Sequence, residues 1–135
     1  FTTEEIYQIL NKDKKQSIHL KSFPSIPSNW KNDVLNEKWS NLRKIKDIAN
    51  ISIEEKRNKK EIGSSLEAFI DIKIGENFSK LIKNLDLPEF FITSKVNLEI
   101  DKKLKDEVIV NTKKAKGVKC KVCWKINEIK CSRHG

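Results

Sequence analysis

Apolar and polar positions follow two different periods along this chain, one helical and one typical of strands. Near the N-terminus, Ile6, Ile9 and Leu10 fall on one helical face, which predicts a short helix that begins at about Thr2. The segment 17–24 is extended in character, and two prolines then mark a loop. The chain should therefore open with a helix and an irregular connection.

A much longer helical stripe begins near Ser28. Its apolar positions are separated by three residues, by four, or by a multiple of four, while lysines and arginines occupy the other faces. The stripe continues through the charged run 54–61, and Gly63 stands where a C-terminal cap is expected. The apolar positions of this predicted helix are Trp30, Val34, Leu42, Ile45, Ala49 and Ile53.

After this helix the period changes to two. Residues 66–74 alternate between apolar and mostly polar side chains, which predicts a half-buried strand. Residues 78–85 carry the apolar stripe of a short helix, residues 89–100 predict a second strand with some irregularity, and residues 107–110 predict a third. This succession of helices and strands predicts an α+β fold.

Length and composition are those of a small folded protein. Of the 135 residues 37% are hydrophobic, enough for a core in a chain of this size. No apolar run approaches the roughly 18 to 20 residues that a membrane-spanning helix needs, and the first residues are unlike a signal peptide. We therefore expect a soluble cytoplasmic protein. Because the chain starts at Phe1 and contains no Met, we expect it to be part of a longer one.

The three cysteines lie together near the C-terminus and are followed by a histidine. Cys120 and Cys123 form one Cys-x-x-Cys pair, and Cys131 and His134 form a second pair seven residues later. Two such turns supply the four ligands of a closed, structural zinc site, with no position left for a catalytic water. The alternative is a cluster of reduced thiols with His134 as an exposed terminal residue.

Positive charge is concentrated in the same region. The whole chain has 28 Lys and Arg against 19 Asp and Glu, and residues 101–135 hold eleven of the former and four of the latter, a net charge of +7. Basic side chains around an exposed indole suit RNA, because lysines neutralise phosphates and an aromatic ring stacks on an unpaired base. Trp124, directly after Cys123, fits that role; the alternative is that it packs over the metal site.

Seven short segments stand in an order and spacing that together are specific. They are Phe1-Thr2-Thr3-Glu4-Glu5-Ile6, Ser17-Ile18-His19-Leu20 with Phe23-Pro24, Trp39-x-x-Leu42-Arg43, Glu54 to Arg57, Ile62-Gly63-Ser64-Ser65-Leu66-Glu67-Ala68, Phe91-Ile92-Thr93-Ser94 and Lys119-Cys120-x-x-Cys123-Trp124. Taken together they resemble the C-terminal end of bacterial isoleucyl-tRNA synthetases. One departure is His134, which stands where the family usually has the last cysteine of a second Cys-x-x-Cys.

The resemblance implies a class I aminoacyl-tRNA synthetase that joins isoleucine to its tRNA with ATP and Mg²⁺, acting as a monomer. This chain itself would contain no catalytic residues, because the family's His-x-Gly-His and Lys-Met-Ser-Lys-Ser motifs are missing from it. The partners implied are isoleucine tRNA and upstream catalytic and editing domains of the same polypeptide.

The sequence thus predicts three segments: the end of a helical anticodon-binding domain (1–62), a small α+β module (63–112) and a zinc-binding tail (113–135). The residues expected near tRNA are Lys119, Lys121, Trp124, Lys125, Arg133, Arg43 and Arg57. The alternative function is a stand-alone zinc-dependent module that binds nucleic acid or an acidic protein without discrimination. A further alternative is a metal-free appendage that docks on its own enzyme.

Overall fold

The computed structural model describes residues 2–11 and 16–134, and the chain divides into two units, Phe1–Asn32 and Asp33–Gly135. Phe1, residues 12–15 and Gly135 lie outside the described residues. Among the described helices, none combines the length and the apolar content needed to cross a membrane. The two units are taken in turn.

The N-terminal unit contains the predicted helix, α1 (Thr2–Leu10), and two single turns of 3₁₀ helix. Within the segment 17–24, which was predicted to be extended, Ile18–Leu20 instead form one of these turns, η1, while Ser17 and Lys21 on either side of it are extended. The reason is local hydrogen bonding: Ser17 Oγ accepts from the backbone N–H of His19 at 3.2 Å and donates to Glu4 Oε2 at 2.9 Å. These side chains give the backbone an alternative to an extended conformation.

The second unit begins with the long helix α2 (Asp33–Asn58). Its buried stripe is the predicted one at Leu42, Ile45, Ala49 and Ile53. Its start is later than predicted, because the residues around Trp30 form a separate 3₁₀ turn, η2 (Ser28–Trp30). Trp30 and Val34 of the predicted stripe are 73% and 81% exposed.

The end of α2 also differs from the prediction. The left-handed residue that closes the helix is Lys60 (φ 58°), so the cap predicted at Gly63 is wrong. Lys60 N–H donates to Arg57 O at 2.9 Å, and Glu61 N–H donates to Lys56 O at 3.0 Å. These two bonds form a Schellman motif, which satisfies the last carbonyls of the helix without a glycine.

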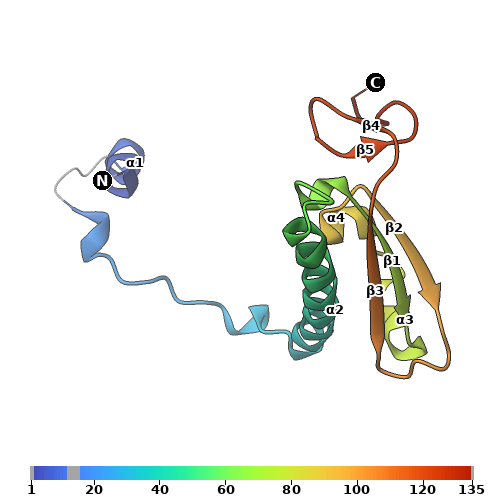
Figure 1. Cartoon of the computed structure of the whole chain (residues 1–135). Coiled ribbons are helices and arrows are strands. Elements are labelled where there is room, and N and C mark those ends of the chain that lie inside the picture. The colour runs from blue at the N-terminus through green and yellow to red at the C-terminus, as the bar shows by residue number, and fades with distance from the viewer. Residues whose placement is uncertain (1, 12–15, 135) are drawn as a thin grey trace. The chain divides into compact units, whose positions relative to one another are not determined.

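Three strands form a mixed sheet in the order β2-β1-β3 (Figure 1). The central strand β1 (Ala68–Ile74) pairs in parallel with β2 (Lys95–Ile100) and antiparallel with β3 (Val108–Lys114). In this register Ile70 lies between Val96 and Thr112. The predicted strands are thus confirmed in type, and the third is longer than predicted.

Two short helices, α3 (Glu76–Ile82) and α4 (Leu87–Phe91), connect β1 to its parallel neighbour. α3 was predicted, whereas the strand predicted from residue 89 is wrong in its first part, which is α4. Asp86 caps α4 by accepting the N–H of Glu89 at 3.2 Å, and Ile92 ends it in the left-handed conformation (φ 56°). These end signals override an apolar run that suits a strand equally well.

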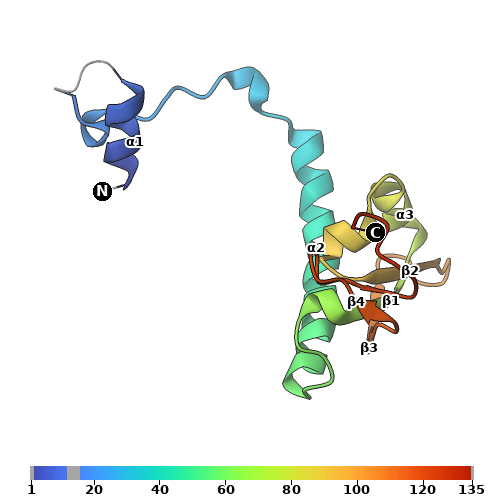
Figure 2. The ribbon, with the colours of Figure 1, turned by 90° about the horizontal axis from the view of Figure 1, so that it is seen from above.

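One face of the sheet carries the core. Eleven buried apolar side chains from α2, the loop after it, β1 and the short helices form a single cluster, and α2 lies along the sheet (Figures 1 and 2). Ser52 of α2 and Thr112 of β3 share a hydrogen bond of 2.8 Å within it. The opposite face is polar: Asp71 accepts hydrogen bonds from Asn97 and Lys113.

β3 leads into a small C-terminal hairpin of β4 (Val118–Lys119) and β5 (Ile126–Asn127), seen beyond the end of the sheet in Figure 1. We call residues 115–134 the knuckle. None of its side chains is buried. The predicted functional segments 1–62, 63–112 and 113–135 remain a prediction, but α2 shares its core with the sheet rather than standing apart from it.

Candidate metal centre and nucleic-acid surface

The knuckle is built on a tight turn between its two short strands. Cys120 N–H donates to Lys125 O at 2.9 Å, and Trp124 N–H donates to Cys120 O at 3.0 Å. To close this turn, Trp124 adopts a left-handed conformation (φ 63°), which is unfavourable for a residue with a side chain. The turn brings the sulfurs of Cys120 and Cys123 to the same side.

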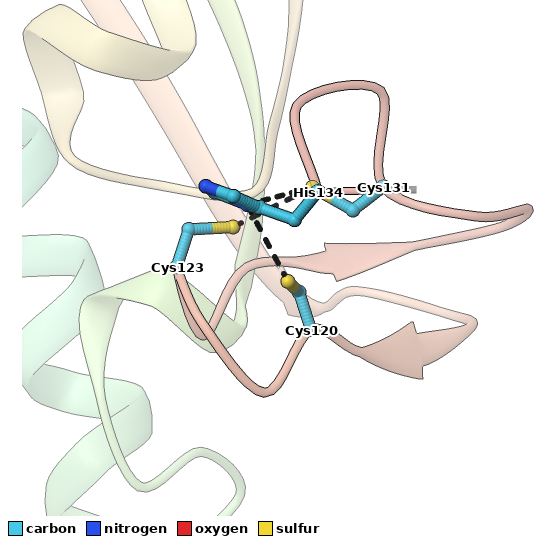
Figure 3. Close-up of side chains that lie close together, drawn as sticks. All are labelled: Cys120, Cys123, Cys131 and His134. Atoms are coloured by element: carbon cyan, nitrogen blue, oxygen red, sulfur yellow. Dashed lines mark hydrogen bonds between the residues drawn. The ribbon is translucent and has the colours of Figure 1, made fainter.

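The second pair of predicted ligands folds back onto the first. Figure 3 shows the side chains of Cys120, Cys123, Cys131 and His134 converging on one point, and their ligand atoms all lie within 4.8 Å of one another. His134 Nδ1 is 3.6 Å from Cys120 Sγ and 3.4 Å from Cys131 Sγ, and the sulfurs of Cys123 and Cys131 are 3.7 Å apart. All four predicted ligands are therefore brought together, His134 included, in a group that is placed to hold a metal ion.

Backbone N–H groups change the pKa values of the three cysteine thiols. The N–H groups of Cys123 and Val122 lower the pKa of Cys120 from 9.0 to about 6, and that of Arg133 lowers the pKa of Cys131. The Lys125 N–H lowers the pKa of Cys123, but desolvation and the neighbouring sulfurs raise it on balance. Because thiolate is the form that binds metals, these amides favour metal binding.

The pKa of His134 is raised through its hydrogen bonds to the sulfurs of Cys131 and Cys120. A proton on this imidazole is thus stabilised by the same two sulfurs that would be its fellow ligands. A metal ion would replace that proton, since histidine binds metals in its neutral form.

We call residues 33–114 the sheet unit. Four of its side chains contact the knuckle, and one of them, Lys95, pairs with Glu128 at 2.8 Å. Ser94 Oγ accepts the N–H of Ile126 at 2.6 Å. Glu67 accepts from Lys119 Nζ at 2.9 Å, and Glu89 of α4 pairs with both Lys125 and Arg133 at 3.0 Å. These contacts position the group of Cys120, Cys123, Cys131 and His134, which we call the metal cluster, at the end of the sheet.

These contacts engage three of the residues predicted to lie near tRNA. Lys119, Lys125 and Arg133 each have a carboxylate partner within the protein. Lys121 and Trp124 are exposed, Trp124 to 61%, so the indole is available to a ligand rather than enclosed over the metal site. The knuckle thus presents an exposed aromatic ring and an exposed lysine.

The other two predicted residues lie on α2, apart from the metal cluster. Arg43 is exposed, and Arg57 is in an ion pair with Glu54 at 2.7 Å. Arg57 lines a hollow that is also lined by Lys114 of β3. The structure thus brings Arg57 close to the basic residues that precede the knuckle.

Sequence reasoning missed the residues that position the knuckle, Glu67, Ser94 and Glu89. The acidic partners of Lys119, Lys125 and Arg133 were not predicted, because they lie about 36 to 52 residues away in the chain. The run at 113–116, with three lysines in four positions, was a usable signal for a basic surface next to the metal site.

The chain is similar to known proteins over nearly its whole length. Residues 1–74 match the family described as the anticodon-binding domain of tRNA ligase. Over 99% of its length the chain is 49% identical to an isoleucine–tRNA ligase of Pelagibacter ubique, and over 93% it is 37% identical to one of Agrobacterium fabrum. A third such ligase, of Caldicellulosiruptor saccharolyticus, is 38% identical over 94% of the chain. In each case the chain spans 14% of the relative's length.

Proposed function

The chain belongs to the family of anticodon-binding domains of tRNA ligases, and we propose that it is the C-terminal, tRNA-binding part of an isoleucine–tRNA ligase. The observation that carries the proposal is the extent of the similarity: it continues from the family's own region through the sheet and the knuckle, in relatives named for isoleucine. The reaction belongs to the parent enzyme, which would use ATP and Mg²⁺ in catalytic and editing domains upstream.

The metal we propose for the knuckle is one structural zinc ion. With bonds of about 2.3 Å to sulfur and 2.0–2.1 Å to nitrogen, a tetrahedral zinc site separates two sulfurs by about 3.8 Å and a sulfur from a nitrogen by about 3.6 Å. Here the sulfurs of Cys123 and Cys131 are 3.7 Å apart, and His134 Nδ1 is 3.6 Å from the sulfur of Cys120 and 3.4 Å from that of Cys131. All the ligand atoms lie within 4.8 Å of one another, so the group needs only a small contraction around the ion. Four protein ligands leave no open position, so the ion would stabilise the fold rather than activate water.

The role of the knuckle in this proposal is to hold Trp124 and Lys121 against unpaired bases and phosphates of tRNA. An unpaired anticodon loop exposes base faces that stack on aromatic side chains, whereas a paired A-form helix hides them. Lys119, Lys125 and Arg133 contribute to the same positive surface while their ion pairs set its orientation. Arg43 and Arg57 would contact the RNA from α2.

The N-terminal unit supports the presence of further protein upstream. Apolar side chains between residues 9 and 34 are largely uncovered, with Phe23 99%, Ile9 82% and Trp30 73% exposed. Exposed apolar side chains in this number suit burial against other protein. We propose that preceding helices of the same polypeptide cover it, in a monomeric enzyme of the cytoplasm.

The test is competition binding of the zinc-loaded chain to isoleucine tRNA against the same tRNA with a changed anticodon, at two salt concentrations. We expect a preference for the correct anticodon that persists at the higher salt. Equal affinities that both collapse with salt would instead indicate phosphate attraction alone, as in a module that binds nucleic acid without discrimination.

A further inference from the structure

A groove between the end of the sheet and the knuckle is separate from the metal cluster and from every residue predicted to contact tRNA. Its volume is about 570 Å³, within the range of sites that hold small molecules. We call it the lysine groove. The lining residues that matter here are Phe69, Lys95, Lys113, Lys114, Lys116 and Lys130.

The charge of the lysine groove is strongly unbalanced. Five lysines line it against a single carboxylate, Glu128, which pairs with Lys95. Lys113 is paired with Asp71 on the open face of the sheet. No ion pair joins Lys114, Lys116 or Lys130 to a carboxylate among residues 2–11 and 16–134. Lys116 and Lys130 are thus available to an external anion, and so is Lys114, whose charge acts on Glu67 without forming an ion pair. By contrast, Lys119, Lys125 and Arg133 of the knuckle are already paired.

The groove also has apolar walls. Phe69, with Lys95 Nζ 5.6 Å from its ring centroid, lines it together with Ile126 and Ile129, and Ile129 is 84% exposed. A free phosphate would need only the lysines. Aromatic and apolar walls beside cations suit a ligand that has both a negative charge and a flat apolar face, as an unpaired nucleotide has.

Basic side chains continue beyond the groove. Lys114 also lines a second hollow, of about 410 Å³, together with Arg57 and Lys60 at the end of α2. This hollow also contains two carboxylates, Glu54 and Glu61, and Glu54 pairs with Arg57 at 2.7 Å, so its excess of positive charge is smaller than that of the lysine groove. Lys114 therefore joins the C-terminal end of α2 to the lysine groove. An extended chain of phosphates could follow this line of cations, whereas a single small anion would use only part of it.

We propose that the lysine groove holds an unpaired stretch of RNA, with phosphates at Lys114, Lys116 and Lys130 and one base against Phe69, Ile126 and Ile129. This rests on the proposed function for the identity of the RNA as tRNA. It adds a binding site between α2 and the knuckle, so that RNA contacts on both sides form one continuous path.

The first experiment neutralises the three available lysines in the whole chain, as Lys114→Gln, Lys116→Gln and Lys130→Gln together. The matched control is Lys80→Gln, Lys102→Gln and Lys103→Gln, which removes the same charge from exposed positions outside both hollows. The probe is a ten-nucleotide single-stranded RNA, titrated at several salt concentrations. The groove variant should reduce the slope of log K against log salt by about 2, because each single-strand phosphate contact contributes about 0.7.

A control variant that weakens binding as much as the groove variant would overturn the proposal. So would polyglutamate, if it binds the unaltered chain as tightly as the RNA does, because the groove would then suit an acidic polypeptide. The anticodon competition described above is independent of this result. If the chain shows no anticodon preference but the groove variant still has a smaller salt slope than the control variant, the tRNA assignment is rejected and the RNA-binding groove is retained.

The second variant, Phe69→Leu, tests the base position. It should weaken RNA binding roughly tenfold at high salt and leave the salt slope unchanged, because stacking contributes without releasing ions. If Phe69→Leu keeps the far-UV circular dichroism and the RNA affinity of the unaltered chain, the proposal that a base stacks on Phe69 is wrong.

Discussion

The sheet unit and the knuckle adjoin in the chain but are stabilised in different ways. All eleven core side chains lie between Leu42 and Phe91, and none of the described residues from 113 onward is buried. The sheet unit is thus held by apolar burial, as an ordinary small domain is. The knuckle lacks that source of free energy, and a metal ion bound by its four converging ligands would provide another. Two adjoining parts of one short chain would then depend for their stability on different chemistry.

The largest effect is expected when a metal ligand is removed. Cys120→Ser should abolish stoichiometric zinc and unfold the knuckle, because metal binding supplies about 10 kcal/mol or more to folding in small zinc modules. Amide hydrogen exchange should show full exposure at β4 and β5, with β1 still protected, and tRNA affinity should fall. Val122→Ser is the control, since it introduces the same residue at a position 67% exposed and outside the ligand set. Unchanged zinc content and exchange in Cys120→Ser would refute the metal-dependent account of the knuckle.

The converse variant acts on the sheet unit. Ile70 is fully buried in β1. Ile70→Ala should lower the free energy of unfolding by about 2 to 5 kcal/mol, because apolar burial is lost and a cavity is left behind. Denaturant titration measures this, and zinc stoichiometry in native buffer should stay at one per chain. The two units would not be independent if Ile70→Ala lost its zinc before the sheet unit unfolded.

A smaller effect on stability is expected from replacing a glycine in the knuckle, Gly117, and a matched control is Gly63 outside it. A Cβ on Gly117 would lie 2.1 Å from Asn127 O, and its φ of 127° is unfavourable for other residues, whereas a Cβ on Gly63 would meet nothing closer than 3.6 Å. Gly117→Ala should destabilise the knuckle by about 1 to 3 kcal/mol, which is a five- to 150-fold loss of zinc affinity. Gly63→Ala should change zinc affinity and unfolding by no more than about 0.5 kcal/mol. Equal zinc affinities for the two variants would contradict this.

The same division explains what could be predicted from the sequence. The buried stripe of α2 and the alternation of β1 were predictable because each repeats a pattern over many residues. The metal ligands were predictable because their spacing is local. Residues 89–92 were not, since an apolar run fits helix and strand alike and the decision is made by the Asp86 cap and the left-handed Ile92.

The contacts that join the units could not be predicted in this way. Glu89 pairs with Arg133, and Ser94 with Ile126, across more than thirty residues of sequence. The lysine groove likewise combines residues from β1, β3 and the knuckle. Such sets are defined by the register of the sheet and by the way the hairpin folds back, neither of which leaves a periodic pattern in the sequence.

The smallest effect concerns the ion pairs at this junction. Hydrogen bonding and charge from Lys125, with the charge of Arg133, lower the pKa of Glu89 from its ordinary value of 4.5. A carboxyl group with a lowered pKa stabilises the folded state above its ordinary pKa and loses that contribution as the pH falls through the lowered value. Glu89→Gln should therefore reduce amide protection at Ile126 near pH 7, and this difference from the unaltered chain should disappear well below pH 4.5. Because Glu89 is exposed, the reduction should be modest.

Protonation of the thiolates and release of zinc at low pH affect both proteins, so the difference between them isolates the ion pairs. Glu99→Gln, which breaks an exposed pair with Lys73 on the sheet, should leave Ile126 protection unchanged. If Glu89→Gln behaved like Glu99→Gln at pH 7, the Ser94 hydrogen bond and the ion pairs of Glu67 and Lys95 would be enough to position the knuckle. The charges on Lys125 and Arg133 would then be available to RNA. The pH dependence of one amide thus distinguishes cations that orient the knuckle from cations that bind a ligand.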